Sequence, residues 1–194
     1  MKTQYSLLLL LLLLGFTQCK SPAAKPDRIS DEALMDTLQR RTFNYFWEGA
    51  EPNSGLACER IHIDGIYPED DQNVVTTGGS GFGIMAVLAG INRGYVTREE
   101  GLARMERIVS FLETADRFHG AYPHWWFGDT GQVKPFGQKD NGGDLVETAF
   151  LMQGLLAVHQ YYINGSPAEQ ALAGRIDTPV SYTHLRAHET SAHL

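Results

Sequence analysis

Gly81–Asp116, with the sequence GFGIMAVLAGINRGYVTREEGLARMERIVSFLETAD, contains two apolar segments joined by a short polar connection. The first segment is almost continuously apolar up to a glycine stop at Gly94, which predicts a buried helix. In the second segment apolar residues recur at helical spacing, and Thr97 and Glu100 have the spacing of a capping box at its start. Because so few residues connect them, the two helices are expected to pack as antiparallel neighbours.

The same periodicity flanks this hairpin on both sides. One apolar helical face begins near Ser30 and ends before the turn formers at 51–55, and another runs from Asp144 to about Ile163. Long, irregular segments rich in aromatic and acidic residues lie between the helical ones, as is common where loops carry function. Convincing strand alternation is absent, so the predicted fold class is all-α, built from repeated helix-loop-helix units.

The N-terminus is predicted to be an export signal. Residues 1–19 combine Lys2 with a run of eight leucines, and this run falls short of the ~20 apolar residues of a membrane span. Cys19 stands where a bacterial lipoprotein signal carries its acylated cysteine, and residues 20–29 form a polar tether. We therefore expect export to the periplasm or the cell surface, with a membrane anchor on Cys19; plain cleavage of the signal is the alternative.

The C-terminus changes composition abruptly near Asp177. Residues 178–194 resemble a translated sequencing adaptor that recurs at the ends of unrelated metagenomic proteins. Their histidines are also typical of a metal-binding tract, but the resemblance is specific and we assign this tail no function. Residues 30–177 are therefore taken as the native domain.

Charge and cysteine content exclude several function classes. The formal net charge of −7 disfavours nucleic-acid binding, which requires a basic surface. Cys58 is the only cysteine besides Cys19, so the domain has no internal disulfide.

No metal site or cofactor is predicted. The glycine-rich run Thr76–Gly83 lacks the Lys and the preceding strand of a phosphate loop, which favours close backbone packing at a helix start.

Three acidic residues form the sharpest candidate for chemistry. Asp144 and Glu147 are three positions apart, so both carboxylates project from one face of a helix, and Asp140 lies just upstream beside Asn-Gly-Gly. Clustered carboxylates raise one another's proton affinity, as acid–base catalysis requires. The same spacing is also that of an ordinary helix cap. From the residues alone, capping and catalysis are equally supported, and they are compatible.

A run of aromatic residues is the second candidate. Trp125 and Trp126 follow His124 in a segment that also contains glycine and proline. Aromatic planes cover the apolar faces of sugar rings, and indole or imidazole nitrogens still form hydrogen bonds. A structural role is the alternative for adjacent tryptophans, but the loop position favours a partly exposed substrate-binding surface.

Several of these motifs together resemble the glucoamylase-like domain of Bacteroidota. The group includes endo-β-1,2-glucanases and is similar to a domain of cyclic β-1,2-glucan synthases. The resemblance extends from about Leu34 to Tyr162. It rests on Leu38–Trp47, Ser54–Ala57, Val75–Gly79 with Gly81–Gly83, Phe118–Ala121 with Pro123–Trp125, and Gly143–Phe150.

The resemblance implies an (α/α)6 barrel, of which only the first helices are present, and inverting hydrolysis of a β-linked glucan, with β-1,2-glucan as the expected substrate. Asp144 and Glu147 fall on the family's acidic motif and are expected to line the substrate cleft, whereas the family's general acid lies beyond residue 177. Two alternatives remain: a non-catalytic glycan-binding lipoprotein, and a polysaccharide lyase, because α/α barrels also serve lyases. The cleft loops are short of the Arg and Lys that neutralise a uronate in lyases.

Overall fold

The structure, a computed structural model, describes residues 28–191. The predicted export signal, Cys19 and most of the tether fall outside these residues. The chain divides into two compact units, residues 1–35 and 36–194. In the first unit, the described residues contain the start of helix α2 (Asp31–Trp47), where the Ser30 hydroxyl accepts a hydrogen bond from the Ala33 amide at 3.2 Å.

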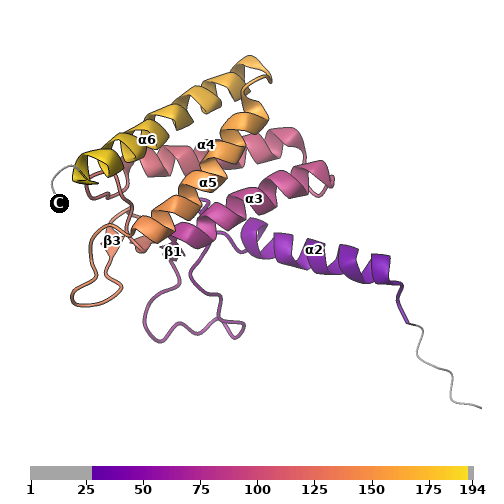
Figure 1. Cartoon of the computed structure of the whole chain (residues 1–194). Helices are drawn as coiled ribbons and strands as arrows, with labels where there is room; N and C mark the ends of the chain where they lie inside the picture. Colours follow the sequence, from indigo (N-terminus) through magenta and orange to yellow (C-terminus); the bar gives the residue numbers. More distant parts are fainter. Residues whose placement is uncertain (1–27, 192–194) are drawn as a thin grey trace, which may run out of the picture. The chain divides into compact units, whose positions relative to one another are not determined.

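The second unit contains the rest of α2 and four further helices (Figure 1). These are α3 (Thr77–Asn92), α4 (Arg98–Thr114), α5 (Leu145–Tyr162) and α6 (Pro167–Ser191). The four predicted helices are confirmed as α2 to α5, most of their ends lying within a few residues of the prediction. No helix in the described part of the chain is long and apolar enough to cross a membrane.

The predicted capping box forms at the start of α4. The Thr97 hydroxyl accepts from the Glu100 amide at 3.1 Å, and the Glu100 carboxylate accepts from the Thr97 amide at 2.8 Å. Gly94 adopts a positive φ of 69° just after α3, the conformation that makes glycine a helix stop. Both ends of the connection between α3 and α4 therefore follow from local sequence.

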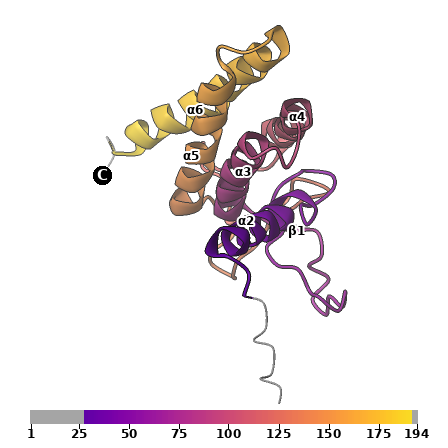
Figure 2. The same cartoon turned by 90° about the vertical axis from the view of Figure 1, so that its right-hand side faces the viewer.

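The start of α3 lies four residues before the predicted position, because packing stabilises a helical turn that glycine disfavours. An added Cβ atom at Gly81 would approach the carbonyl oxygen of Phe150 to 2.2 Å, and one at Gly154 would approach the Gly81 carbonyl oxygen to 2.7 Å. The predicted close backbone packing is thus confirmed. Helices α3 and α5 lie side by side in both views (Figure 1 and Figure 2).

A small antiparallel sheet corrects the prediction that strands are absent. Strand β2 (Trp125–Phe127) lies between β1 (Val74–Thr76) and β3 (Val133–Lys134), with Val75 opposite Trp126. Strands of two or three residues are too short to show alternation, although β-branched and aromatic residues favour them. The sheet joins the two long loops to the starts of α3 and α5, where the candidate residues lie.

Helix α6 is the element that the sequence prediction missed. Ser166 and Glu169 form its capping box, since the Glu169 carboxylate accepts from the Ser166 amide at 2.6 Å and the Ser166 hydroxyl accepts from the Glu169 amide at 3.4 Å. Pro167 occupies the first helical position, where its missing N–H costs nothing. The helix packs on α4 and α5, and its backbone continues through the residues that we predicted to be a foreign tail.

The core lies between α3, α4, α5, α6 and the sheet. Its largest fully buried side chains include Trp126, Tyr122, Tyr162, Leu56, Ile84, Met105 and Leu112. Arg104 of α4 donates to the carbonyl oxygens of Phe46 at 3.2 Å and Trp47 at 3.0 Å, so the last carbonyls of α2 are satisfied by another helix. The side of the core that meets the starts of α3 and α5 carries the candidate site.

Candidate functional site

Asp144 is the N-cap of α5, as the capping interpretation predicted. Its Oδ1 accepts hydrogen bonds from the amides of Val146 at 2.9 Å and Glu147 at 3.0 Å. Two of the unpaired amides at the helix start are thereby satisfied. Asp144 Oδ2 takes no part in the cap and points to another partner.

Glu147 does not complete the capping box. The Asp144 amide donates to the Tyr122 carbonyl oxygen at 2.7 Å instead, and Glu147 Oε2 accepts from the Gly78 amide at 2.7 Å. Gly78 lies in the first turn of α3, so the Glu147 carboxylate faces the positive end of a neighbouring helix. An added Cβ atom at Gly78 would lie 2.5 Å from Glu147 Oε2, which explains the glycine at this position.

His124 joins the two helix starts. Its Nδ1 lies 2.9 Å from Asp144 Oδ2, and its carbonyl oxygen accepts from the Thr77 amide at 3.1 Å. Thr77 is the neighbour of Gly78, which binds Glu147, and the Glu147 amide in turn donates to Asp144. The contacts form a closed circuit through both carboxylates, so the structure brings His124, Asp144 and Glu147 together.

The surroundings of Asp144 favour its charged form. Partial burial raises the pKa of this carboxyl, but hydrogen bonds from the amides of Glu147 and Val146 and from the His124 ring outweigh burial, so the pKa lies below its ordinary value of 3.8. The group is therefore a carboxylate at neutral pH. It can accept a hydrogen bond or a proton, but it does not hold a proton ready to donate.

An aromatic cluster lies beside this pair. The His124 ring contacts Phe136 at a centroid distance of 4.2 Å and Trp125 at 5.4 Å, and the Trp125 and Phe136 rings are 4.7 Å apart. The Lys134 ammonium lies 5.3 Å from the centre of the Trp125 ring. Trp125 is half-buried and Phe136 is half-exposed, so the cluster presents an aromatic surface to solvent next to Asp144.

Phe136 and Lys134 were missed by the sequence prediction. Both lie in the polar segment between β2 and α5, which has no helical or strand periodicity. The available signal was Phe136 itself, a large apolar residue in an otherwise polar loop. Pairing of β3 with β2 brings Lys134 opposite Trp125, a long-range register that local patterns do not contain.

Trp126 is not part of this surface, and the prediction of a substrate-binding role for it is wrong. Its side chain is fully buried, because successive residues of a strand point to opposite sides. The indole Nε1 donates to the Asp116 carbonyl oxygen at 2.9 Å, and the ring packs edge-on against Phe111 and Tyr122. The structural alternative is correct for Trp126, and only Trp125 keeps an accessible face.

Asp140 lies in an exposed turn of the loop before α5. Its carbonyl oxygen accepts from the amides of Phe136 at 2.9 Å and Gly137 at 3.2 Å, and its amide donates to Gly137 at 3.1 Å. The backbone of Asp140 therefore closes the turn that carries Phe136. Within residues 28–191, no hydrogen bond joins its carboxylate to Asp144 or Glu147.

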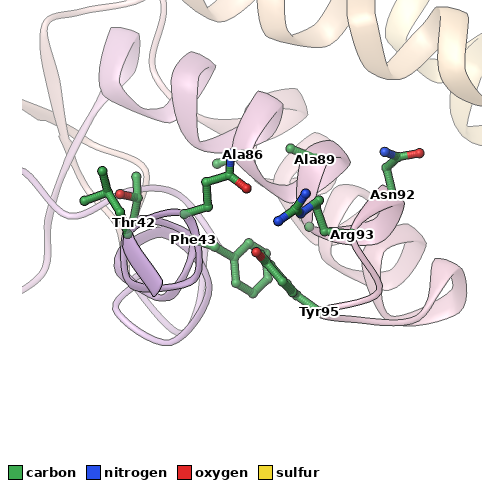
Figure 3. A pocket seen from close by; sticks show the side chains of 10 residues that line it. Thr42, Phe43, Ala86, Ala89, Asn92, Arg93 and Tyr95 are labelled. Atoms are coloured by element: carbon green, nitrogen blue, oxygen red, sulfur yellow. The ribbon is translucent and has the colours of Figure 1, made fainter. Parts of the chain in front are cut away.

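Two other features lie apart from this cluster. A pocket of about 430 Å³ opens between α2 and α3, with the rings of Phe43 and Tyr95 at one side (Figure 3). Its lining is mainly apolar and includes none of the candidate residues.

Cys58 is buried, and burial, together with the nearby Glu51, raises the pKa of its thiol to about 11, so it is not a nucleophile at neutral pH.

The arrangement is suited to a neutral ligand that carries hydroxyl groups. A carboxylate fixed by two amides and an imidazole can accept hydrogen bonds from hydroxyls or from water. The adjoining aromatic surface can cover the apolar face of a ring. Each of the two carboxylates is held in place by its own backbone donors.

Comparisons with known proteins give close relatives over about four-fifths of the chain. An exo β-1,2-glucooligosaccharide sophorohydrolase of Parabacteroides distasonis is 53% identical over 150 residues, covering 77% of this chain and 20% of that protein. An endo-β-1,2-glucanase of Chitinophaga pinensis, solved with sophorotriose and glucose, is 64% identical with a TM-score of 0.77, covering 78% of this chain and 36% of that one.

A glucoamylase-like protein of Bacteroides caccae is 83% identical with a TM-score of 0.76, covering 77% of this chain and 36% of that structure. No family model matches the chain. The chain thus spans about a fifth of the relative from P. distasonis and little more than a third of these two solved relatives.

Proposed function

We propose that the whole protein is a glycoside hydrolase acting on β-1,2-linked glucan, because this chain is a homologue of the glucoamylase-like proteins and β-1,2-glucanases of Bacteroidota. The observation that carries the proposal is the 64% identity to an endo-β-1,2-glucanase that was solved with a β-1,2-linked oligosaccharide. The sophorohydrolase supports the same linkage at 53% identity.

The site supports this proposal on chemical grounds. An aromatic face beside two fixed carboxylates is the combination that sugar-binding clefts use, since rings cover C–H faces and carboxylates accept hydroxyl protons. We propose that Trp125, Phe136 and His124 border the substrate path, and that Asp144 and Glu147 line its floor. Asp140, on the turn that carries Phe136, is proposed to reach the sugar from the rim.

The lowered pKa of Asp144 limits its part in the reaction. A carboxylate that is charged at neutral pH serves as a base or as a hydrogen-bond acceptor, and the proton for the leaving group must come from another residue. An inverting enzyme places its acid and base about 6.5–9.5 Å apart, with a water between base and sugar. We propose that Asp144 or Glu147 positions this water, and that the general acid belongs to the part of the protein beyond residue 177.

We also propose that these helices belong to an α/α barrel. Apolar side chains remain exposed on α3 and α5, including Phe82, Met85, Phe150 and Leu156. Such faces require further helices to cover them. This chain spans 36% of each of two solved relatives, so those proteins are long enough to contain such further helices.

A substrate panel tests the proposed function. The full-length gene product is incubated with purified β-1,2-glucan, β-1,3-glucan, cellulose oligomers and starch, and new reducing ends are measured. We expect release from β-1,2-glucan alone, with products of inverted anomeric configuration in proton NMR. Activity confined to another glucan would refute the β-1,2 assignment while leaving the hydrolase class in place.

Two assays added to this panel separate the alternatives: an affinity gel that contains β-1,2-glucan, and incubation with a uronate polymer. A non-catalytic glycan-binding protein would migrate more slowly in an affinity gel that contains β-1,2-glucan, and it would release no reducing ends. A lyase would release products with ultraviolet absorbance from a uronate polymer, because elimination leaves a double bond. Neither outcome is expected, since the two relatives at 53% and 64% identity are a sophorohydrolase and an endo-β-1,2-glucanase.

A further inference from the structure

We propose that His124 is a positioning residue for Asp144, which fixes the carboxylate through its Nδ1–H group instead of binding sugar directly. This inference rests on the proposed function, in which Asp144 accepts a proton or a hydrogen bond. The sequence predicts that His124 contacts the substrate, because it lies in the aromatic segment. The role proposed here is different.

The two oxygens of Asp144 have separate donors. Oδ1 is occupied by the amides of Val146 and Glu147, at 2.9 and 3.0 Å. These bonds fix the position of one oxygen but allow the carboxylate plane to rotate about it. The His124 contact at 2.9 Å holds Oδ2, and the plane is thereby defined.

The His124 ring is itself held on several sides. Phe136 lies across it at 4.2 Å with an interplanar angle of 37°, and Trp125 meets it edge-on at 5.4 Å and 89°. The His124 carbonyl oxygen is bound to the Thr77 amide at 3.1 Å, at the start of α3. These contacts restrict the rotamers of the His124 side chain. A ring with so few accessible rotamers can orient the carboxylate that it contacts.

The anchor at Thr77 also links His124 to the second carboxylate. Gly78, the next residue, donates to Glu147 Oε2 at 2.7 Å. A shift of the His124 segment would therefore move the donors of both carboxylates together. The contact that positions Asp144 and the contact that holds Glu147 are thus linked through the neighbours Thr77 and Gly78.

The tautomer follows from the charge of Asp144. A carboxylate without a proton offers only acceptors, so the hydrogen between Nδ1 and Oδ2 must belong to His124. This makes two amide replacements informative. The side-chain nitrogen of Asn falls near the position of Nδ1, whereas that of Gln reaches the position of Nε2.

Steady-state kinetics of three variants of the full-length protein on β-1,2-glucan test the proposal. His124→Ala and His124→Gln should lower kcat by about ten- to a hundredfold, the effect of one lost hydrogen bond to a charged group, with KM nearly unchanged. His124→Asn should restore most of kcat. Retained activity in His124→Gln with loss in His124→Asn, or a rise in KM alone, would overturn the proposal in favour of direct sugar binding.

A second readout is independent of turnover. The Asp144 carboxyl is titrated by carbon-13 NMR, with Asp144→Asn to assign its signal. Its pKa should rise toward the ordinary value in His124→Ala and His124→Gln and stay low in His124→Asn; an unchanged pKa in all three would overturn the proposal. If the wild type cleaves no glucan, the proposed function fails while this titration still decides the role of His124.

Discussion

Asp144 caps α5 through one carboxylate oxygen and contacts the His124 ring through the other. The spacing to Glu147 predicted a helix start and two carboxylates on one face, and the cap is confirmed. The reciprocal bond of a capping box does not form, because the Glu147 carboxylate instead accepts from the Gly78 amide, 69 residues away in the chain. Local spacing contains no information on such a partner, just as it could not show that Trp126 points into the core and Trp125 does not.

Conservative substitutions separate capping from catalysis at these two residues. Asn caps a helix about as well as Asp, and the carbonyl oxygen of Gln can still accept from Gly78. In the full-length protein, Asp144→Asn and Glu147→Gln should therefore keep a near-normal Tm, while at least one loses about a hundredfold in turnover or more. Asp144→Ala should also lose about 1 kcal/mol of stability with its cap. Wild-type turnover in both amide variants would place the catalytic groups elsewhere.

The charge of Asp144 also predicts a pH dependence of stability. Because its folded-state pKa is lowered from 3.8, the ionised cap stabilises the fold above that value, and the contribution is lost as pH falls through the lower folded value. The difference in urea midpoint between wild type and Asp144→Asn should thus be constant near neutral pH and shrink in acid. If the difference in urea midpoint stays constant down to about pH 2, the charge of the Asp144 carboxylate contributes nothing to the stability of the fold.

Whole elements were predicted well where the signal was local. The capping box of α4 and the glycine stop of α3 were read from adjacent residues and are confirmed. Helix α6 had an equally local signal, Ser166 with Glu169 around a proline, which was not used. The three strands were beyond sequence patterns, because each is too short to alternate and pairs with a distant segment.

The contact between α3 and α5 depends on glycine. An Ala side chain at Gly154 would press on the Gly81 carbonyl oxygen, 2.7 Å from the added Cβ atom, and backbone yields poorly. Gly154→Ala should destabilise the protein by about 1–3 kcal/mol, despite the better helix propensity of Ala. Gly174→Ala in α6 is the control, because no atom lies within 4 Å of its added Cβ; denaturant unfolding that ranks the two variants equally would refute this packing account.

At the scale of the whole molecule, this chain spans 36% of each of two solved relatives. The family could be predicted because several different motifs of that family are spread along the chain. The closed barrel, the general acid beyond residue 177 and the foreign origin of residues 178–194 are proposals that rest on resemblance. Export and the lipid anchor are likewise predictions, because Cys19 lies outside the described residues.

Cell fractionation tests the anchor. If Cys19 is acylated, Cys19→Ser should move a tagged full-length protein from the membrane fraction to the soluble one, because stable attachment requires more than a single acyl chain and a lipoprotein cysteine carries several. Lys20→Ser is the matched control and should stay with the membrane. Membrane association that survives Cys19→Ser would favour plain signal cleavage with another mode of attachment.

The most direct test of the account is the initial rate at which the full-length protein releases reducing ends from purified β-1,2-glucan, measured beside the double variant Asp144→Asn with Glu147→Gln. We expect sustained release by the wild type. We expect a loss of at least about a hundredfold in the variant, at a near-normal Tm. Equal rates in the two proteins, or no release by a folded wild type, would contradict the assignment of β-1,2-glucan hydrolysis to these carboxylates.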